Sequence, residues 1–384
     1  MLPKHFRLPL PFGFISLLAI GLSGCHTSLN HIEDVEYIAL APSVSTSNFS
    51  TSSPTEIYSA PTKDTTPTVS MPPDAASENI VPSIKQDTVT VDDFANAISD
   101  ADFILLGELH GTKEHHQLQH AVLEILIEHQ KKPALVFEMF DQEQAALIDA
   151  VVSRPKVSAG DLARAVDWKK SGWPEWRYYR PLVRTALDND LEIVAGNLSR
   201  KDAFSAVKKI AAGEAPDSLI PAHLNTMGLE NPLPNKDFEK LKALLDHTHH
   251  SAGHEQQTSS ETKNPAKKPN EKERHEEAAK DTLEESERSD HAKRFANGMY
   301  FAQRLRDATL ASNMLGLNAD TVVLIAGRQH TRQDYGVPHY IRLSQTDKKI
   351  ISIAFVSKSG LTNSKLTEAS NNSKPAFNYL MVYD

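Results

Sequence analysis

The sequence predicts an α/β fold with an open, largely parallel sheet flanked by helices. Short, continuous apolar runs are typical of strands that are buried on both faces. Segments with helical spacing follow these runs, and such alternation of strand and helix is typical of a parallel sheet. The four runs that predict central strands are Phe103–Gly107, Ala134–Met139, Leu191–Asn197 and Thr321–Gly327.

The connecting segments support the same fold. Between residues 113 and 130, apolar residues recur at helical spacing on one face, and Pro133 blocks continuation of that helix. Two later apolar runs, at 349–356 and 377–384, predict edge or added strands. Further helices are expected at residues 92–98, 142–152, 158–167, 175–189, 200–212, 236–245 and 295–315.

The N-terminus has the features of a lipoprotein signal peptide. Basic residues Lys4 and Arg7 precede the apolar stretch Phe12–Leu22, which is too short to span a bilayer. The segment Leu22–Cys25 then resembles a lipobox. Residues 1–24 are therefore predicted to be removed, leaving Cys25 to carry lipid such as palmitate. A buried cysteine after an ordinary apolar segment is the alternative; no disulfide can form within the chain, because this is its one cysteine.

The segment after the lipobox predicts a flexible tether. Residues 25–88 are rich in Ser, Thr and Pro and contain few large apolar side chains. Such a segment cannot bury enough surface to offset the entropy of ordering it. We therefore expect disorder over 25–88, a reach of roughly 45 Å, and a folded domain over residues 89–384.

A second atypical segment interrupts the folded domain. Residues 246–291 contain six histidines, many charged residues and almost no apolar ones. This composition predicts a flexible insertion, either disordered or a mobile charged helix. Imidazole suits several divalent metals, so the candidate metal ligands are His247, His249, His250 and His254. The alternative is a solvated charged loop.

The charge balance argues against a nucleic-acid partner. The formal net charge is −9, and no basic stripe of the kind that nucleic-acid binders carry is present in the sequence.

Polar residues gather where the predicted strands end. The carboxyl ends of parallel strands meet at one edge of a sheet, and ligands bind in the crevice beyond them. Carboxylates placed there are costly to bury unless they are paired or bind something. The pattern predicts a binding site; the alternative is a network of salt bridges, for example between Glu138 and Arg328. The residues concerned are Glu108, His110, Glu138, Asn197, Arg328 and His330.

Several blocks of sequence together resemble the ChaN-like haem-binding lipoprotein family. They occur in order over residues 95–356, interrupted by the histidine-rich insertion. The blocks are ILLGELHGTKEHHQLQHAVLEIL, PALVFEMF, WKKSGWPEWRYYRPLV, IVAGNLSR, FAQRLRDATLASNML and VVLIAGRQHTRQDYGVP. The resemblance implies a periplasm-facing, iron-regulated lipoprotein that binds haem, with haem binding linked to formation of a homodimer. The pattern is also similar to erythromycin esterase-like and TraB/Tiki-like proteins, some of which are hydrolases.

Haem binding requires an axial ligand to the iron, an apolar slot and partners for the propionates. Under the resemblance, the candidate cofactor-binding residues are His110, His330, Tyr178, Tyr300, Tyr335, Arg328, Glu108 and Glu138. The aromatic residues between 168 and 179 either form a wall of the slot or pack in the core. Arg177 and Arg180 join Arg328 as candidate propionate partners.

The favoured hypothesis is an envelope lipoprotein that binds haem in uptake or handling, with a haem receptor as a partner. His26 follows the lipidated cysteine where an Asp would resemble an inner-membrane retention signal, which favours the outer membrane, facing the periplasm. The first alternative is a metal-dependent hydrolase in which Glu108, His110, Glu138 and His330 hold a metal or act as acid and base. The second is a non-catalytic scaffold for an envelope receptor.

Overall fold

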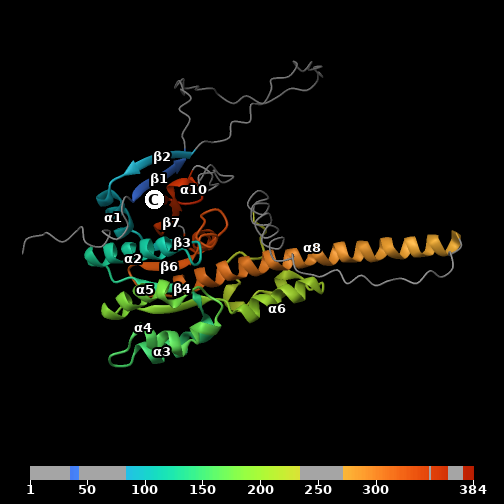
Figure 1. Ribbon diagram of the computed structural model, residues 1–384, viewed down its shortest axis with the longest axis horizontal. Helices are drawn as coiled ribbons and strands as arrows, with labels where there is room; N and C mark the ends of the chain where they lie inside the picture. The colour runs from blue at the N-terminus through green and yellow to red at the C-terminus, as the bar shows by residue number, and fades with distance from the viewer. Residues whose placement is uncertain (1–34, 43–83, 234–270, 346, 362–374) are drawn as a thin grey trace, which may run out of the picture.

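A computed structural model describes residues 35–42, 84–233, 271–345, 347–361 and 375–384. Its centre is an eight-stranded sheet in the order β2-β1-β8-β7-β3-β6-β4-β5. The strands from β8 to β5 are parallel, whereas β1 pairs antiparallel with β2 and with β8. The predicted α/β fold with an open, largely parallel sheet is thus confirmed (Figure 1).

All four predicted central strands are present. They are β3 (Phe103–Glu108), β4 (Ala134–Asp141), β5 (Ile193–Asn197) and β6 (Val322–Gly327). Every residue of β3 and β6 is buried, as expected of strands covered by helices on both faces. The prediction holds because burial on both faces requires a continuous apolar run.

The later apolar runs occupy unexpected places in the sheet. β7 (Ile350–Ser357) lies between β3 and β8, and β8 (Tyr379–Tyr383) lies between β7 and β1. Of the two alternatives, edge strands are therefore wrong for both, whereas added strands are confirmed, since both extend the sheet beyond the four central strands. The actual edges are β5 and β2 (Ile84–Val89).

The prediction of disorder over residues 25–88 is wrong at two places. Residues Glu36–Pro42 form β1, and β2 begins at Ile84, so the folded unit includes both. Ile38 and Leu40 of β1 are buried and pack in one apolar cluster with Leu380 of β8. This burial compensates the ordering entropy locally, which the average composition of the segment conceals. Residues 43–83 lie outside the described part of the chain.

Helices cover both faces of the sheet. Along β3, Ile104 and Leu106 belong to one apolar core, whereas Phe103 and Leu105 belong to the other, as the alternation of side chains along a strand requires. The first core is covered by α1 (Val91–Ser99), α2 (Lys113–Glu128), α3 (Ala145–Val152), α4 (Ala159–Ala165) and α5 (Trp176–Asp188). The second is covered by α6 (Arg200–Ala211), α8 (Glu271–Leu315) and α9 (Val337–Ser344). The short α10 (Lys358–Leu361) follows β7.

Helix α8 extends well beyond the sheet (Figure 1). It begins within the predicted insertion, so the helical alternative holds for residues 271–291. The rest of the insertion, with the candidate metal ligands His247, His249, His250 and His254, lies outside the described residues. So do the predicted signal peptide, Cys25 and the helix expected at 236–245. No helix within the described ranges is long and apolar enough to cross a bilayer.

Candidate functional site

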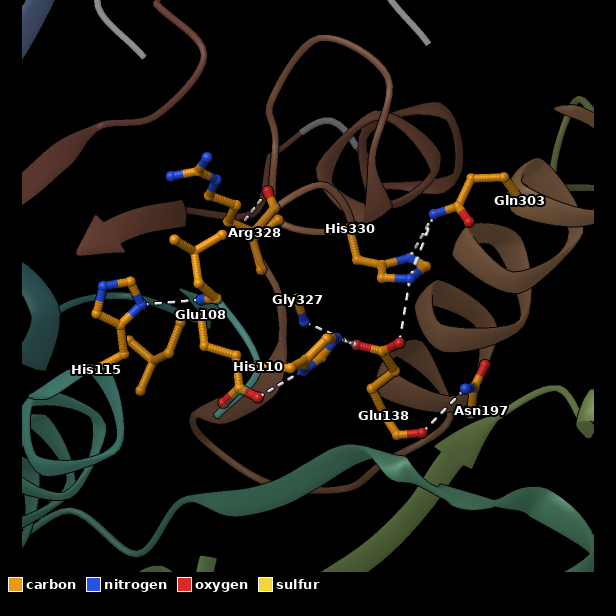
Figure 2. Close-up of polar contacts among 12 residues, drawn as sticks. Glu108, His110, His115, Glu138, Asn197, Gln303, Gly327, Arg328 and His330 are labelled. Carbon is orange, nitrogen blue, oxygen red and sulfur yellow. Dashed lines mark hydrogen bonds and ion pairs between the residues drawn. The ribbon is translucent and has the colours of Figure 1, made fainter. Parts of the chain in front are cut away.

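Three neighbouring strands bring the candidate residues to one edge of the sheet. Strands β3 and β4 come first in the sequence, and β6, which comes later, lies between them in the sheet. Glu108 ends β3, Glu138 lies in β4 and Gly327 ends β6, so two carboxylates flank one glycine (Figure 2). His110 and His330 follow in the two loops. This is the crevice in which open parallel sheets bind ligands.

An irregularity in β4 positions Glu138. The register with β5 pairs Phe137 with Ala195 but then jumps to Asp141 with Asn197. Such bulges are common beside functional sites, where they redirect a side chain. Glu138 Oε2 accepts a hydrogen bond from the Gly327 N–H at 2.7 Å, and Asn197 Nδ2 donates to the Glu138 carbonyl at 2.9 Å.

Glu108 is held from several sides. It is 1% exposed, and its Oε1 accepts hydrogen bonds from Tyr179 Oη and His110 Nδ1, both at 2.7 Å. Its Oε2 accepts from Gln119 Nε2 at 2.8 Å and lies 3.2 Å from His116 Nδ1. These contacts offset the cost of burying the carboxylate.

His110 links the two carboxylates and is the accessible member of the site. Its side chain is 36% exposed, and its Nε2 lies 3.8 Å from Glu138 Oε2, beyond hydrogen-bond distance. The ring lies against Gly327, where a Cβ would be 2.8 Å from Nε2. Trp173 packs edge-on against it, with ring centroids 5.1 Å apart. Burial lowers the pKa of His110, but the hydrogen bond to Glu108 and the charge of Glu138 outweigh burial and raise the pKa above its ordinary value.

The loop that carries His110 is fixed by helix α2. The Leu109 N–H donates to His115 Nδ1 at 2.8 Å (Figure 2). On the other side of the ring, His115 Nε2 lies 3.0 Å from Tyr383 Oη. Since Nδ1 accepts, the proton of neutral His115 is on Nε2. Burial lowers the pKa of His115 to about 4, so this histidine is a neutral structural element.

His330 is buried and both of its ring nitrogens are engaged. Nε2 lies 3.3 Å from Glu138 Oε1, and Nδ1 lies 2.5 Å from Asp307 Oδ1 of α8. Burial lowers the pKa of His330, but the two carboxylates outweigh burial and raise it to about 10. Burial correspondingly raises the pKa of Glu138, yet the charge of His330 outweighs it and holds the pKa at about 2. Burial, with Glu138 nearby, raises the pKa of Asp307 to about 6.

This edge of the sheet therefore carries an acid–histidine chain, which we define as Glu108, His110, Glu138 and His330 from the strands and their loops, with Asp307 from α8. Its members alternate in charge, which stabilises each buried ion through its neighbours. Of the six strand-end residues singled out from the sequence, the structure brings Glu108, His110, Glu138 and His330 together in this way. Their role in binding stays a prediction. Among the residues that the structure describes, no group of three or more His, Cys, Asp or Glu side chains is arranged to hold a metal ion.

Comparison with known proteins agrees with this architecture. A family described as "Haem-binding uptake, Tiki superfamily, ChaN" matches residues 94–341, which is more than half of the chain. The chain belongs to this family. No curated protein matches it.

A solved structure of a ChaN protein has the same fold. The chain is similar to ChaN of Campylobacter jejuni, solved with cofacial haem, at 18% identity and a TM-score of 0.52, covering 78% of this chain and 94% of that chain. It is also similar, more distantly, to the erythromycin esterase EreC in its open conformation, at 14% identity and a TM-score of 0.35, covering 76% of this chain and 78% of that chain.

Some of the candidate haem ligands suggested by the ChaN resemblance are not members of the acid–histidine chain. Tyr335 is buried and donates to Gln329 Oε1 at 2.6 Å, and it shares a small separate apolar cluster with Tyr300. Tyr178 is half-buried and stacks on His116, with centroids 5.3 Å apart. The expected salt bridge between Glu138 and Arg328 is absent, because Glu138 contacts His330 instead.

Arg328 and the aromatic block have defined surroundings. Arg328 is half-buried and points away from Glu138 (Figure 2), and burial, with the charge of Arg332, lowers its pKa. Trp168 is buried and donates from Nε1 to the Pro174 carbonyl at 2.8 Å, so it packs in the core. Trp173 is half-buried beside His110, as a wall of the site would be.

The sequence reasoning missed two residues of the candidate site. Asp307 lies on α8 and Gln119 on α2, each on the buried face of its helix. Polar residues at core-facing positions of an amphipathic helix are a usable signal, because burying them requires a partner. That signal also applies to His116, on the same face as Gln119.

Proposed function

We propose that this chain is an envelope lipoprotein that binds haem, in haem or iron uptake or handling, with His110 as the ligand to iron. Membership of a haem-binding uptake family supports haem binding. The observation that carries the second is the geometry of His110, which is the partly exposed histidine of the acid–histidine chain.

The surroundings of His110 fit a haem ligand. Histidines that bind metals commonly donate their other ring N–H to a carboxylate, which fixes the ring and increases its basicity. His110 Nδ1 makes this contact with Glu108 at 2.7 Å, whereas Nε2 has no hydrogen bond within the described part of the chain. Trp173 supplies an aromatic surface beside the ring. Haem supplies an iron atom that accepts such a nitrogen ligand.

The other candidates fit the iron less well. His330 has carboxylate oxygens at both ring nitrogens, and Tyr335 Oη is bonded to Gln329. We therefore assign His330 and Glu138 to supporting the site and His110 to contacting the ligand.

Haem titration of the purified full-length chain, followed by the Soret band, tests this proposal. We expect His110→Ala to weaken binding by at least about tenfold, and Glu108→Gln to weaken it by about 10-fold to 100-fold as loss of a supporting partner. His129→Ala is the matched control, since His129 is an exposed C-cap of α2. Equal affinities of wild type and His110→Ala would reject His110 as the ligand.

The anchor is a separate part of the proposal and rests on the sequence around Cys25. We expect lipid on this residue to hold the protein at the outer membrane, facing the periplasm. Cys25→Ser should abolish processing and shift the protein out of the membrane fraction. Membrane fractionation in a density gradient checks both, and a variant that is processed and fractionates like wild type rules the anchor out.

The proposal also includes partners. A homodimer that forms on haem binding predicts a shift in size-exclusion elution when haem is added, and a haem receptor predicts haem transfer. An elution volume that haem leaves unchanged speaks against the dimer.

A hydrolase is the second candidate, and the pair Glu108–His110 favours it. A histidine oriented by a buried carboxylate, with a raised pKa, has the features of a general acid or base. Hydrolysis of ester or amide substrates that disappears in both Glu108→Gln and His110→Ala would support it. An equally low rate of hydrolysis in wild type and in both variants would reject the hydrolase function.

A further inference from the structure

A polar cavity lies beside the acid–histidine chain. Its volume is about 250 Å³, and it lies where β4 and β5 end and α6 begins. Trp173 links the two sites, since it lines the cavity and contacts His110. The lining residues used below are Asp141, Asp167, Lys170, Asn197, Arg200 and Arg306.

Two guanidinium groups line this cavity, and neither lies within salt-bridge distance of a carboxylate of the described residues. Within the described part of the chain, neither Arg200 nor Arg306 forms an ion pair, and Arg306 Nε is buried without a hydrogen-bond acceptor. Leaving a buried charged donor unsatisfied is costly. Asn197, which is 1% exposed, also has an unpartnered Oδ1 and would accept from a water molecule or a ligand N–H or O–H.

The remaining charges leave the cavity positive. Lys170 and Asp167 pair with each other at 2.8 Å. Asp141 is then the counter-charge to two arginines. Burial raises the pKa of Asp141 above its ordinary value, even though Arg306 and Arg200 act to lower it. The cavity therefore favours an added anion.

An apolar groove adjoins the same two arginines. A second cavity of about 170 Å³ lies between α6 and α8 and is lined by Arg200, Ala203, Phe204, Val207, Met299, Ala302, Gln303 and Arg306. Phe204 is 50% exposed there. Arg200 and Arg306 thus stand at the junction of a polar cavity and an apolar surface.

We propose that Arg200 and Arg306 bind the carboxylate groups of an amphipathic ligand whose apolar body covers the groove between α6 and α8. Guanidinium groups suit carboxylates because they can donate two parallel hydrogen bonds. The polar cavity is smaller than the usual range of about 300–1,000 Å³ for drug-sized ligands, but it admits a carboxylate side chain. If the proposed function holds, the ligand is haem and the carboxylates are its propionates; this assignment rests on that function.

Two forms of the porphyrin test the inference on the full-length chain. Iron protoporphyrin IX carries two carboxylates, and its dimethyl ester carries none. We expect wild type to bind the diacid at least about tenfold more tightly than the diester, since only the carboxylates of the diacid can form bidentate, charge-assisted hydrogen bonds with the guanidinium groups. The variant Arg200→Gln/Arg306→Gln should lose this preference and bind the diester as wild type does.

Two further variants separate charge from structure. Arg306→Lys keeps the charge and should retain most of the preference, whereas Arg184→Gln, an exposed arginine paired with Asp188, should leave it unchanged. Equal affinities of wild type for diacid and diester, or an unchanged preference in the double variant, would overturn the inference.

A haem-free measurement distinguishes failure of the inference from failure of the proposed function. If neither porphyrin binds, the haem function fails, and the carboxylate site is judged with succinate. A melting temperature that succinate raises in wild type but not in Arg306→Gln supports a site for a small carboxylate instead of propionates. No stabilisation of wild type by succinate, with no porphyrin binding, overturns the site.

Discussion

The loops after β3 and β6 have the same spacing, a glycine followed three residues later by a histidine, but the two histidines differ in their surroundings. The His110 side chain is 36% exposed and has one ring nitrogen in a hydrogen bond. The His330 side chain is 7% exposed and has a carboxylate oxygen at each nitrogen. The same local pattern therefore produces one residue that can meet a ligand and one that holds buried acids together.

The difference arises from what covers each loop. Helix α8 lies over the loop after β6 and contributes Asp307 and Gln303, both of which contact the His330 ring. The loop after β3 is held from one side by His115 and is flanked by Trp173, which leaves part of His110 exposed. Coverage by a helix, and not the spacing in the sequence, decides which histidine is structural.

The largest expected effect is a difference in protein stability between the alanine variants of the two histidines. His330→Ala should lower the free energy of unfolding by about 3–5 kcal/mol, because it leaves two buried carboxylates without the charge between them. His110→Ala should change it by less than about 1 kcal/mol, since part of that side chain is in water. Chemical denaturation followed by circular dichroism measures both. Equal losses of unfolding free energy in the two variants would contradict the difference in role between the two histidines.

The second expected effect is a difference in titration. His330 has a pKa raised to about 10, so its stabilising contribution is fully present below its ordinary pKa of 6.5 and is lost as the pH rises through 10. His110 also has a raised pKa, but its exposed edge should let it titrate at lower pH than His330. Histidine NMR signals, assigned with the two alanine variants, check the order.

The protonation of His110 should also make haem affinity depend on pH. Iron requires neutral His110, so affinity should increase with pH, by at most about tenfold per pH unit, until His110 is deprotonated. Affinity that falls over that range would contradict the role of His110. His110→Ala, which lacks the titrating group, is the control and should show a weaker pH dependence.

The smallest expected effect comes from adding a methyl group at each of two glycines. A Cβ at Gly327 would meet the movable His110 ring at 2.8 Å, whereas a Cβ at Gly336 would meet the backbone oxygen of His330 at 2.3 Å. Gly327→Ala should therefore displace His110 with a stability loss below about 1 kcal/mol, and Gly336→Ala should lose about 1–3 kcal/mol, as overpacking does. Thermal melts beside haem titration distinguish them. A Gly327→Ala variant with unchanged haem binding would argue against contact through His110.

Much of the sheet was predictable because burial on both faces forces a recognisable sequence. β3, β4, β5 and β6 are continuous apolar runs, and each was expected where it occurs. β1 was missed, since a seven-residue strand is hidden within a segment rich in Ser, Thr and Pro. The place of β7 inside the sheet was also missed, because strand order depends on pairing between distant segments.

The candidate site could likewise be predicted from the sequence only in part. That Glu108, His110, Glu138 and His330 meet follows from their positions at strand ends, because parallel strands present those ends at one edge. The identity of their partners did not follow. Asp307 reaches His330 from α8, and Tyr179 reaches Glu108 from α5, across 71 positions of sequence.

Local apolar patterns and strand direction are sufficient to predict the α/β class, the central strands and the group of acids and histidines at the strand ends. The three-dimensional packing alone places β6 between β3 and β4, encloses His330 while leaving His110 partly exposed, and brings Arg200 and Arg306 to one cavity. These features depend on packing because exposure, pKa and the pairing of charges are set by the distant elements that cover a residue. Local sequence does not contain that information.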